Sequence, residues 1–567
     1  MDTVAALLAE RAGDEHVGLK VEDRAFSWAQ IVHEGASRGS LALGVRRDGP
    51  FHVGVLLDNV PEYLFWIVGA ALAGAAVVGV NSTRRGAELV RDVRHTDCQL
   101  LVTDRAHLPL LDGLDVGIGP GSLLVVDEPE YADAVASYAG AAIPDVRVEP
   151  GDRLLLLFTS GSTGAPKAVV CSQGRLAGIG GRISEMFAIT RGTTTYSAMP
   201  LFHGNALMAN WAGVLATGAT FSMRPRFSAS GFLPDVRHFG ASFFNYVGRA
   251  LAYVLATPEQ PDDADNPLEL GFGTEASARD REEFTRRFAC RLIENYGSSE
   301  GAIAVGWSPG APPGSLGRAL HGADVAVVDP ATGSACPPAE FDDDGRMTNG
   351  DEAIGELVGR NVVERFEGYY NNPEADAERL RGGWYWSGDL GFRDADGWLY
   401  FAGRSSDWLR VDGENFAAAP VEAVLARFPG VVMVAVYPVA DPRTGDAVMA
   451  ALELAPGTSL DARAFGEFLV SQRDLGTKWA PRFVRVVPAM PLTATNKVQK
   501  ASLRAGGWSV EDLVLWRPGR ELAYRELTAD DRRELDRLAA EHGRPTQENQ
   551  PRLTDAPTPG APASGAR

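Results

Sequence analysis

The chain has little cysteine, no excess of positive charge and few long apolar runs. Its four cysteines are far apart and form no CxxC pair, which argues against a zinc site or a disulfide framework and fits a reducing compartment, the cytoplasm. The net charge of -20 argues against nucleic acid or an anionic membrane as the main partner. It does not argue against a nucleotide, which needs only a local positive site.

The sequence also lacks a recognisable targeting or membrane segment. The first residues, MDTVAALLAERAGDE, have no basic region and are too acidic for a signal peptide. The longest apolar run, Leu64–Val80, is slightly shorter than the roughly 20 residues of a membrane-spanning helix, and glycines interrupt it. We therefore predict no transmembrane segment, and we expect this run to be a buried helix followed by a buried strand.

The length of 567 residues predicts more than one domain. In residues 1–150, helix-like and strand-like segments alternate, which predicts a mainly parallel sheet with helices on both faces. Val421–Phe428 has the pattern of a helix, and residues 511–542 have that of a charged helix. Residues 543–567 are rich in proline, alanine and glycine, and we expect them to be a disordered tail.

The most informative segment is Leu154–Val170, in which an apolar run typical of a buried strand is followed by small and hydroxylated residues. Glycine has no Cβ, so the backbone N–H groups of such a loop can approach phosphate oxygens, and Lys167 adds a mobile positive charge. The spacing is neither that of a P-loop nor that of a dinucleotide-binding GxGxxG. The predicted phosphate-binding residues are Thr159, Ser160, Gly161, Ser162, Thr163, Gly164 and Lys167.

Thr159–Val169 resembles the phosphate loop of the adenylate-forming superfamily, the acyl-CoA synthetases and their relatives, with Ala168 in place of the usual glycine. The other motifs of that superfamily follow in order as LGFGTEAS, ENYGSSEG, GWYWSGDLGFRDADGWLYFAGR and PLTATNKVQKASL. The FNYVG sequence that ends at Gly248 is most similar to the fatty-acid-transport-protein branch.

The resemblance implies an α/β fold with a large N-terminal domain of parallel-rich sheets flanked by helices and a small, mobile α+β C-terminal domain. The expected boundaries are a large domain at 1–403, a hinge at 404–410 and a small domain at 411–542. Ser406 stands at the hinge position, where the family often has Asp or Lys. A small residue can absorb the backbone change of a domain rotation, so rotation is still expected.

The resemblance also implies how ATP and Mg²⁺ are bound. Tyr296 would stack on adenine, Ser299 would contact phosphate, and Glu300 would hold Mg²⁺, a hard cation that takes carboxylate and phosphate oxygens. Asp389 would bind both ribose hydroxyls, and Arg404 would reach ribose or phosphate. The backbone around adenine would come from Gly273, Thr274 and Glu275, and the ATP-binding set also includes Asn295, Gly297 and Ser298.

Two further groups of residues follow from the same resemblance. Lys497 would bridge the carboxylate and the α-phosphate during adenylation, with Lys500 as its neighbour on a different face. Asn496 replaces the usual glycine before this lysine, and asparagine tolerates the left-handed backbone conformation better than most residues. The predicted acid pocket contains His203, Phe243, Tyr246 and Val247, and the predicted CoA-side loop contains Gly413, Glu414 and Asn415.

The implied reaction joins a small-molecule acid to ATP, releases pyrophosphate, and transfers the acyl group to coenzyme A, with Mg²⁺ as cofactor and a homodimer as a possible assembly. Two alternatives stay open. The first is an ATP-dependent diazotase or nitrosating enzyme of the same fold, which adenylates nitrite for transfer to an amine. The second is a nucleotide-binding protein without catalysis, which would be expected to lack Lys497 or Glu300. Gly204 and Ala206 would allow a long acyl chain, whereas the aromatic residues at 243–246 would suit a flat ring, so the acid is left open.

Overall fold

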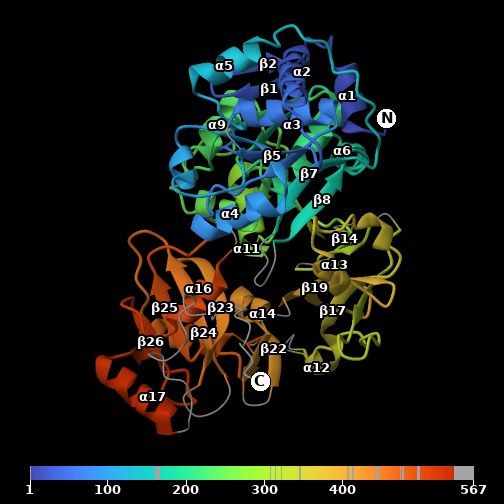
Figure 1. Ribbon diagram of the computed structural model, residues 1–567. Helices are drawn as coiled ribbons and strands as arrows, with labels where there is room; N and C mark the ends of the chain where they lie inside the picture. Colours follow the sequence, from blue (N-terminus) through green and yellow to red (C-terminus); the bar gives the residue numbers. More distant parts are fainter. Residues whose placement is uncertain are drawn as a thin grey trace, which may run out of the picture.

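The computed structural model describes residues 2–119, 121–159, 166–276, 278–306, 308, 310–312, 314–320, 322–343, 347–404, 408–411, 414–441, 446–472, 474–475, 478–493 and 498–541. The predicted α/β class is confirmed, with a large N-terminal domain and a smaller C-terminal domain (Figure 1). Within the described residues, no helix is long and apolar enough to cross a membrane.

The first sheet of the large domain has six strands in the order β6-β5-β3-β4-β7-β8, and all neighbours are parallel except β7 and β8. The predicted phosphate loop connects these two antiparallel strands. The run Leu64–Val80 forms most of helix α3 and strand β4, as expected, and both are buried. The strands are β3 (His52–Leu56), β4 (Ala76–Gly79), β5 (Cys98–Thr103), β6 (Leu123–Val125), β7 (Arg153–Phe158) and β8 (Ala168–Ser172).

The second sheet has nine strands in the order β15-β14-β13-β12-β11-β9-β10-β1-β2. Strands β13, β12, β11, β9, β10 and β1 are parallel, whereas the pairs at both edges are antiparallel. The strands are β1 (Val17–Val21), β2 (Arg24–Ser27), β9 (Thr194–Ser197), β10 (Thr220–Met223), β11 (Phe243–Val247), β12 (Leu270–Thr274), β13 (Arg291–Gly297), β14 (Ala304–Gly306) and β15 (Arg318–Ala319).

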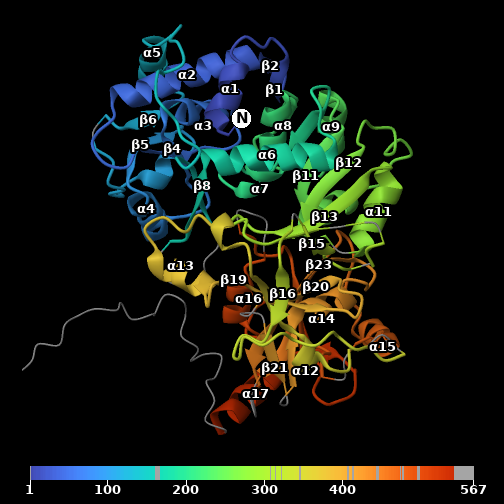
Figure 2. The same ribbon diagram turned by 90° about the vertical axis from the view of Figure 1, so that its right-hand side faces the viewer.

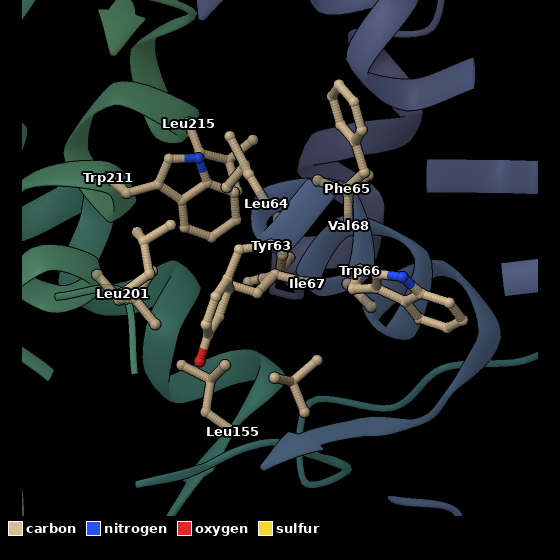
Figure 3. Close-up of a cluster of buried hydrophobic side chains, with 14 of the residues drawn as sticks. Tyr63, Leu64, Phe65, Trp66, Ile67, Val68, Leu155, Leu201, Trp211 and Leu215 are labelled. Carbon is tan, nitrogen blue, oxygen red and sulfur yellow. The ribbon is translucent and has the colours of Figure 1, made fainter. Parts of the chain in front are cut away.

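Helices cover both faces of these sheets. The main core lies between the two sheets, where α2 packs on α3 and α3 faces the helical segment α7, η2 and α8 (Figure 3). Figure 3 shows Trp211 and Leu215 of this segment facing Tyr63 and Leu64 of α3. The helices are α1 (Val4–Glu10), α2 (Trp28–Gly44), α3 (Pro61–Ala73), α4 (Gly86–His95), η1 (Leu108–Leu111), α5 (Pro129–Ala136), α6 (Gln173–Phe187), α7 (Gly204–Ala206), the π-helical turn η2 (Leu207–Trp211), α8 (Ala212–Thr217), α9 (Phe232–Phe239), α10 (Gly248–Leu255) and α11 (Ala278–Phe288).

A third sheet of the large domain carries the segment predicted to bind ribose. Its strands follow the order β16-β17-β19-β18, and β20 pairs with β19 so that Asp389 lies opposite Arg404. The elements are β16 (Val325–Val328), α12 (Gly350–Ala353), β17 (Gly355–Gly359), η3 (Val363–Arg365), α13 (Pro373–Arg379), β18 (Leu380–Arg381), β19 (Trp384–Arg393) and β20 (Leu399–Arg404).

The C-terminal domain is built on a sheet in the order β23-β24-β25-β26-β27, with a separate apolar core on each face. It lies below the large domain in Figure 2, and Tyr253 and Arg279 of the large domain contact it through hydrogen bonds to Glu453 and to the carbonyl of Ala426. Its elements are β21 (Trp408–Val411), β22 (Glu414–Ala417), α14 (Ala418–Leu425), β23 (Val431–Ala440), β24 (Asp446–Leu454), α15 (Ala462–Ser471), β25 (Phe483–Val487), α16 (Lys500–Gly506), β26 (Val514–Trp516), β27 (Arg525–Glu526) and α17 (Ala529–Glu541).

Two predictions for this domain need correction. Residues 511–542 are not one helical segment, because Val514–Trp516 pairs with β25 and all three of its side chains are buried, so this apolar triplet continues the sheet. In the described part of this stretch, which ends at residue 541, only α17 is helical. The helix predicted at Val421–Phe428 begins three residues earlier, at Ala418. The predicted tail at 543–567 lies outside the described residues, and the boundaries around 404–410 stay a prediction.

Candidate active site

The predicted phosphate loop begins where β7 ends. The backbone N–H of Thr159 donates to the carbonyl oxygen of Lys167 at 3.1 Å, which closes the two ends of the loop on each other. Lys167 Nζ lies 2.9 Å from Glu378 Oε2 and 5.9 Å from the centre of the Tyr369 ring. Glu378 and Tyr369 therefore fix the position of the Lys167 side chain where the loop ends. The predicted residues Ser160, Gly161, Ser162, Thr163 and Gly164 lie outside the described residues.

Glu300 is 6% exposed and is held by a hydrogen bond from its neighbour Tyr369, whose hydroxyl donates to Oε1 at 2.7 Å. Arg379 Nε in turn donates to the Tyr369 hydroxyl at 3.3 Å. A Mg²⁺ ion fits Glu300, because this cation is typically held by one or two carboxylates together with phosphate oxygens and water. Among the described residues, no group of three or more acidic, histidine or cysteine side chains could hold a metal ion by itself, so phosphate oxygens and water would have to supply the other ligands.

The predicted adenine loop follows β12 and is shaped by close backbone contacts. A Cβ atom at Gly273 would lie 2.5 Å from the Tyr246 ring, and one at Gly248 would lie 2.0 Å from the carbonyl oxygen of Glu275. Glu275 has a φ of 68°, in the left-handed region that few residues other than glycine adopt. Such strain is often found at ligand sites, and here the packing of Gly248 against the loop maintains it.

Glu294 supports this loop from behind. Its Oε1 atom accepts hydrogen bonds from the backbone N–H of Ala276 at 2.7 Å and from the Tyr246 hydroxyl at 3.4 Å. Burial raises the pKa of Glu294 to about 7, and Arg281, at 3.7 Å from Oε2, opposes this effect. The carboxyl group is therefore partly protonated near neutral pH.

The predicted adenine-stacking and ribose-binding residues are in direct contact. The Tyr296 hydroxyl donates to Asp389 Oδ2 at 2.6 Å, so β13 of the second sheet is joined to β19 of the third. The turn before Asp389 is fixed by Glu356, whose Oε1 accepts a hydrogen bond from the backbone N–H of Gly388 at 2.7 Å. The residues predicted to stack on adenine and to bind ribose are thus adjacent in the structure. The backbone of Arg404 is described, but its side chain is not.

The predicted acid pocket is only partly brought together. His203 stands before the first turn of α7, and a Cβ atom at Gly204 would lie 3.0 Å from Ser299 Oγ, so this helix begins beside the ENYGSSEG loop. Phe243 and Val247 point to the face of β11 that meets this helix. Tyr246 points to the opposite face, because side chains alternate along a strand. Tyr246 therefore lies on the other face of β11 from Phe243 and Val247, where it packs against Gly273, and its assignment to the acid pocket stays a prediction.

The remaining predicted residues belong to the C-terminal domain or its hinge. Lys500 Nζ lies 2.8 Å from Glu422 Oε1, so its charge is engaged within this domain. The backbone of Glu414 and Asn415 begins strand β22. Ser406, Gly413 and Lys497 lie outside the described residues, and so does Asn496. Asn295 and Gly297 are part of β13, and Ser298 and Ser299 follow it directly.

Three residues that contact the predicted site were not found from the sequence. Tyr369 is absent from the predicted site residues, although its hydroxyl donates a hydrogen bond to Glu300. Glu378 and Arg379 end the short helix α13 and reach Lys167 and Tyr369. Their signal in the sequence is one acidic and one basic residue on a helix, which is typical of a solvated surface. No pattern therefore distinguished them.

Two protein-family models match this chain. The family model described as AMP-binding enzyme matches residues 11–370, and the model of the AMP-binding enzyme C-terminal domain matches residues 420–497. A steroid-22-oyl-CoA synthetase of Rhodococcus jostii is 53% identical over 96% of this chain and 98% of its own length. The medium/long-chain-fatty-acid–CoA ligase FadD17 of Mycobacterium marinum is 43% identical over 90% of this chain and 98% of its own length.

Solved structures show the same fold. The anthranilate CoA ligase AuaEII in complex with anthranoyl-AMP has a TM-score of 0.79 at 22% identity, over 89% of this chain and 97% of that chain. ATP-bound MatB from Rhodopseudomonas palustris has a TM-score of 0.76 at 22% identity, over 89% of this chain and 98% of that chain. The two relatives above are a CoA synthetase and a CoA ligase, and none of these comparisons supports the alternative of nitrite adenylation.

Proposed function

The chain belongs to the AMP-binding enzyme family as an ATP-dependent, AMP-forming acyl-CoA ligase, and from this premise we propose that its acid substrate is a steroid with a carboxylated side chain. The observation that carries this proposal is the 53% identity to a steroid-22-oyl-CoA synthetase over nearly the full length of both chains. A medium- or long-chain fatty acid is the second candidate, because the FadD17 ligases are 43–44% identical.

The reaction takes place in two steps. In the first, a carboxylate oxygen of the acid attacks the α-phosphorus of ATP, and pyrophosphate leaves. In the second, the thiol of CoA attacks the acyl carbonyl, and AMP leaves. Both partners of the first step are anions, so catalysis must offset their repulsion and hold the reacting atoms in line. No covalent bond to the enzyme is needed, and positioning and electrostatics do most of the work.

We assign these tasks to named residues. Lys167 and the phosphate loop bind the triphosphate, and Glu300 would hold Mg²⁺, which neutralises phosphate charge. The hydrogen bond from Tyr369 fixes the direction of the Glu300 carboxylate before ATP arrives. Asp389 and Tyr296 bind the nucleoside, and Lys497 is the proposed bridge between the carboxylate and the α-phosphate.

The acid would lie between β11 and the helix that begins at Gly204. Phe243 and Val247 are apolar residues on this face of β11, which favours a hydrophobic acid. Gly204 has no side chain beside Ser299, so the backbone of the helix can approach the reacting carboxylate. These features support a bulky apolar acid, and the choice of a steroid rests on the relative named above.

The test is a comparison of acids with purified protein, ATP and Mg²⁺. Acyl-CoA formation and AMP release are measured with a steroid C22 acid, a long-chain fatty acid and an aryl acid, each with and without CoA. We expect the largest kcat/KM for the steroid acid, and Glu300→Gln should abolish turnover with every acid. A larger kcat/KM for the fatty acid than for the steroid acid would refute the steroid proposal and favour the second candidate.

Two further points belong to the same proposal. A cytoplasmic location is supported by the four free cysteines, which a reducing compartment keeps unpaired. A homodimer is the proposed assembly. Cell fractionation tests the first, and the molar mass from light scattering tests the second.

A further inference from the structure

Three asparagine side chains form a chain of hydrogen bonds between strand β11 and the helix that follows His203. Asn210 Nδ2 donates to Asn245 Oδ1 at 2.8 Å, and Asn245 Nδ2 donates to Asn205 Oδ1 at 2.5 Å. Asn210 and Asn245 are 0% and 3% exposed, and Asn205 is half-buried. Burying amides in an apolar layer costs free energy unless each is hydrogen-bonded. Apolar side chains would fill the same volume without this cost, so the three hydrogen-bonded amides need an explanation beyond packing.

Backbone carbonyl groups fix the direction of the chain. Asn210 Nδ2 also donates to the carbonyl oxygen of Tyr196 at 3.1 Å, and Asn245 Nδ2 also donates to the carbonyl oxygen of Asn205 at 3.4 Å. Turning either amide over would bring its oxygen against a carbonyl oxygen. Both amides therefore donate toward Asn205, and hydrogen bonds in series strengthen one another.

The two ends of the chain differ in their surroundings. At the buried end, Asn210 Oδ1 has no hydrogen-bond partner among the described residues, which costs about 1–3 kcal/mol. At the other end, Asn205 Oδ1 is taken by Asn245, so the Asn205 amide nitrogen is the terminal donor. Among the residues that the structure describes, none accepts a hydrogen bond from Asn205 Nδ2. A Cβ atom on the preceding residue, Gly204, would lie 3.0 Å from Ser299 Oγ, so the turn that carries Asn205 begins beside a residue predicted to contact phosphate.

The π-helical turn η2 makes the arrangement possible. In a π turn the hydrogen bonds join residues five apart, so side chains five apart lie nearly one above the other. Asn205 and Asn210 are five apart and therefore both reach Asn245 on the strand, which a regular α-helix would prevent. On another side of the same segment, Trp211 and Leu215 pack against α3 and hold it in place (Figure 3). π turns of this kind are frequent at functional sites.

We propose that the side-chain amide of Asn205 donates a hydrogen bond to one carboxylate oxygen of the acid substrate, and that Asn245 and Asn210 are positioning residues that aim it. A hydrogen bond to an ionised carboxylate is stronger than one between neutral groups. The amide carries no charge, so it orients the acid without neutralising the oxygen that attacks the α-phosphorus. The proposal rests on the acyl-CoA ligase activity, but it does not depend on which acid is used.

The first test separates the acid from ATP. With the best acid of the panel above, Asn205→Ala should lower kcat/KM for the acid about 10–100-fold, as for loss of a hydrogen bond to a charged group. Asn205→Asp should lower it further, because two carboxylates repel each other. The KM values for ATP and CoA should not change. Asn266→Ala is the matched control, since Asn266 is a half-buried amide that bonds to backbone carbonyls far from this site, and it should leave every KM unchanged.

The second test asks whether Asn245 acts through Asn205. Asn245→Leu should lower kcat/KM for the acid in the wild-type protein but have no further effect when Asn205→Ala is already present. If Asn245→Leu does not fold, judged by its thermal unfolding, Asn210→Leu replaces it in the same cycle. Additive losses would overturn the positioning role. An unchanged kcat/KM for the acid in Asn205→Ala, or an equal loss for acid and ATP, would overturn the proposal. Preference for a different acid would refute only the steroid proposal.

Discussion

Glu294 lies behind the adenine loop with its side chain 17% exposed, and burial raises its pKa from 4.5 to about 7. Between these two values the folded protein keeps the proton of Glu294 while the unfolded chain loses it. The free energy of unfolding therefore falls as the pH rises from about 4.5 to 7 and stays lower above that range. The direction is opposite to that of a carboxylate held by a salt bridge, which contributes stability at high pH.

Glu294→Gln should remove this pH-dependent loss of unfolding free energy. Glutamine retains an oxygen that can accept from the N–H of Ala276 and the hydroxyl of Tyr246, but it carries no charge. A pKa difference of this size corresponds to about 3 kcal/mol of unfolding free energy. Part of this gain is lost, because Arg281 is then left without the opposite charge. We expect the variant to be about 1–3 kcal/mol more stable than the wild type at pH 8, and the difference to shrink as the pH falls toward 5.

The assay is urea denaturation of both proteins at several pH values between about 5 and 8.5, with ligand absent. Glu283→Gln is the control, because Glu283 is an exposed carboxylate of α11 that pairs with Arg286, and hydrogen bonding to this arginine lowers its pKa. The control should show no gain at pH 8. A Glu294→Gln variant that is less stable than the wild type at pH 8, or whose difference from it does not change with pH, would refute the reasoning.

Three further predictions concern other parts of the structure. Hydrogen bonding to Asp58 raises the pKa of His107. The stability that the charged His107 contributes is therefore complete below its ordinary pKa and is lost as the pH rises through the pKa of the folded protein. His107→Asn should cost about 1–2 kcal/mol of unfolding free energy near pH 5.5 and less at pH 8.5, measured by thermal unfolding. Gly248→Ala would place a Cβ atom 2.0 Å from the Glu275 carbonyl oxygen, and should cost about 1–3 kcal/mol and raise the KM for ATP, measured by denaturation and kinetics. Lys167→Met should lower ATP–pyrophosphate exchange by about 100-fold without changing thermal stability, because an exposed ion pair adds little to it.

The sequence predicted the framework well where the pattern was local. The apolar run that forms α3 and β4 and the alternation of helices and strands both follow from hydrophobic periodicity, and the structure confirms them. The motifs predicted the family, which the family models confirm. The failure at residues 511–542 has a simple cause. A short apolar triplet among charged residues fits a helix face or an edge strand equally well, and only the presence of β25 decides between them.

The site was predicted less completely, because part of it depends on contacts between distant segments. The resemblance assigned Phe243, Tyr246 and Val247 to one pocket, but side chains alternate along β11, so Tyr246 lies on the other face of the strand from the other two. Glu294 is the first residue of the ENYGSSEG motif, and nothing in the motif shows that its side chain accepts a hydrogen bond from the backbone of Ala276. The chain of amides uses Asn205 and Asn210 from one helix and Asn245 from a strand, and only the π turn brings the first two to one face.

Strand β11 lies between the proposed acid site and the predicted adenine loop. On one face it carries Phe243, Asn245 and Val247 toward the space proposed for the acid, and on the other it carries Tyr246 against Gly273 of the adenine loop. A shift of this strand along its axis would therefore move the acid wall and the nucleotide support together. The parallel pairing of Tyr246 with Gly273, and of Val247 with Thr274, resists such a shift. If the acid and the nucleotide bind as proposed, this pairing fixes the distance between the two binding surfaces, which is what catalysis by positioning requires.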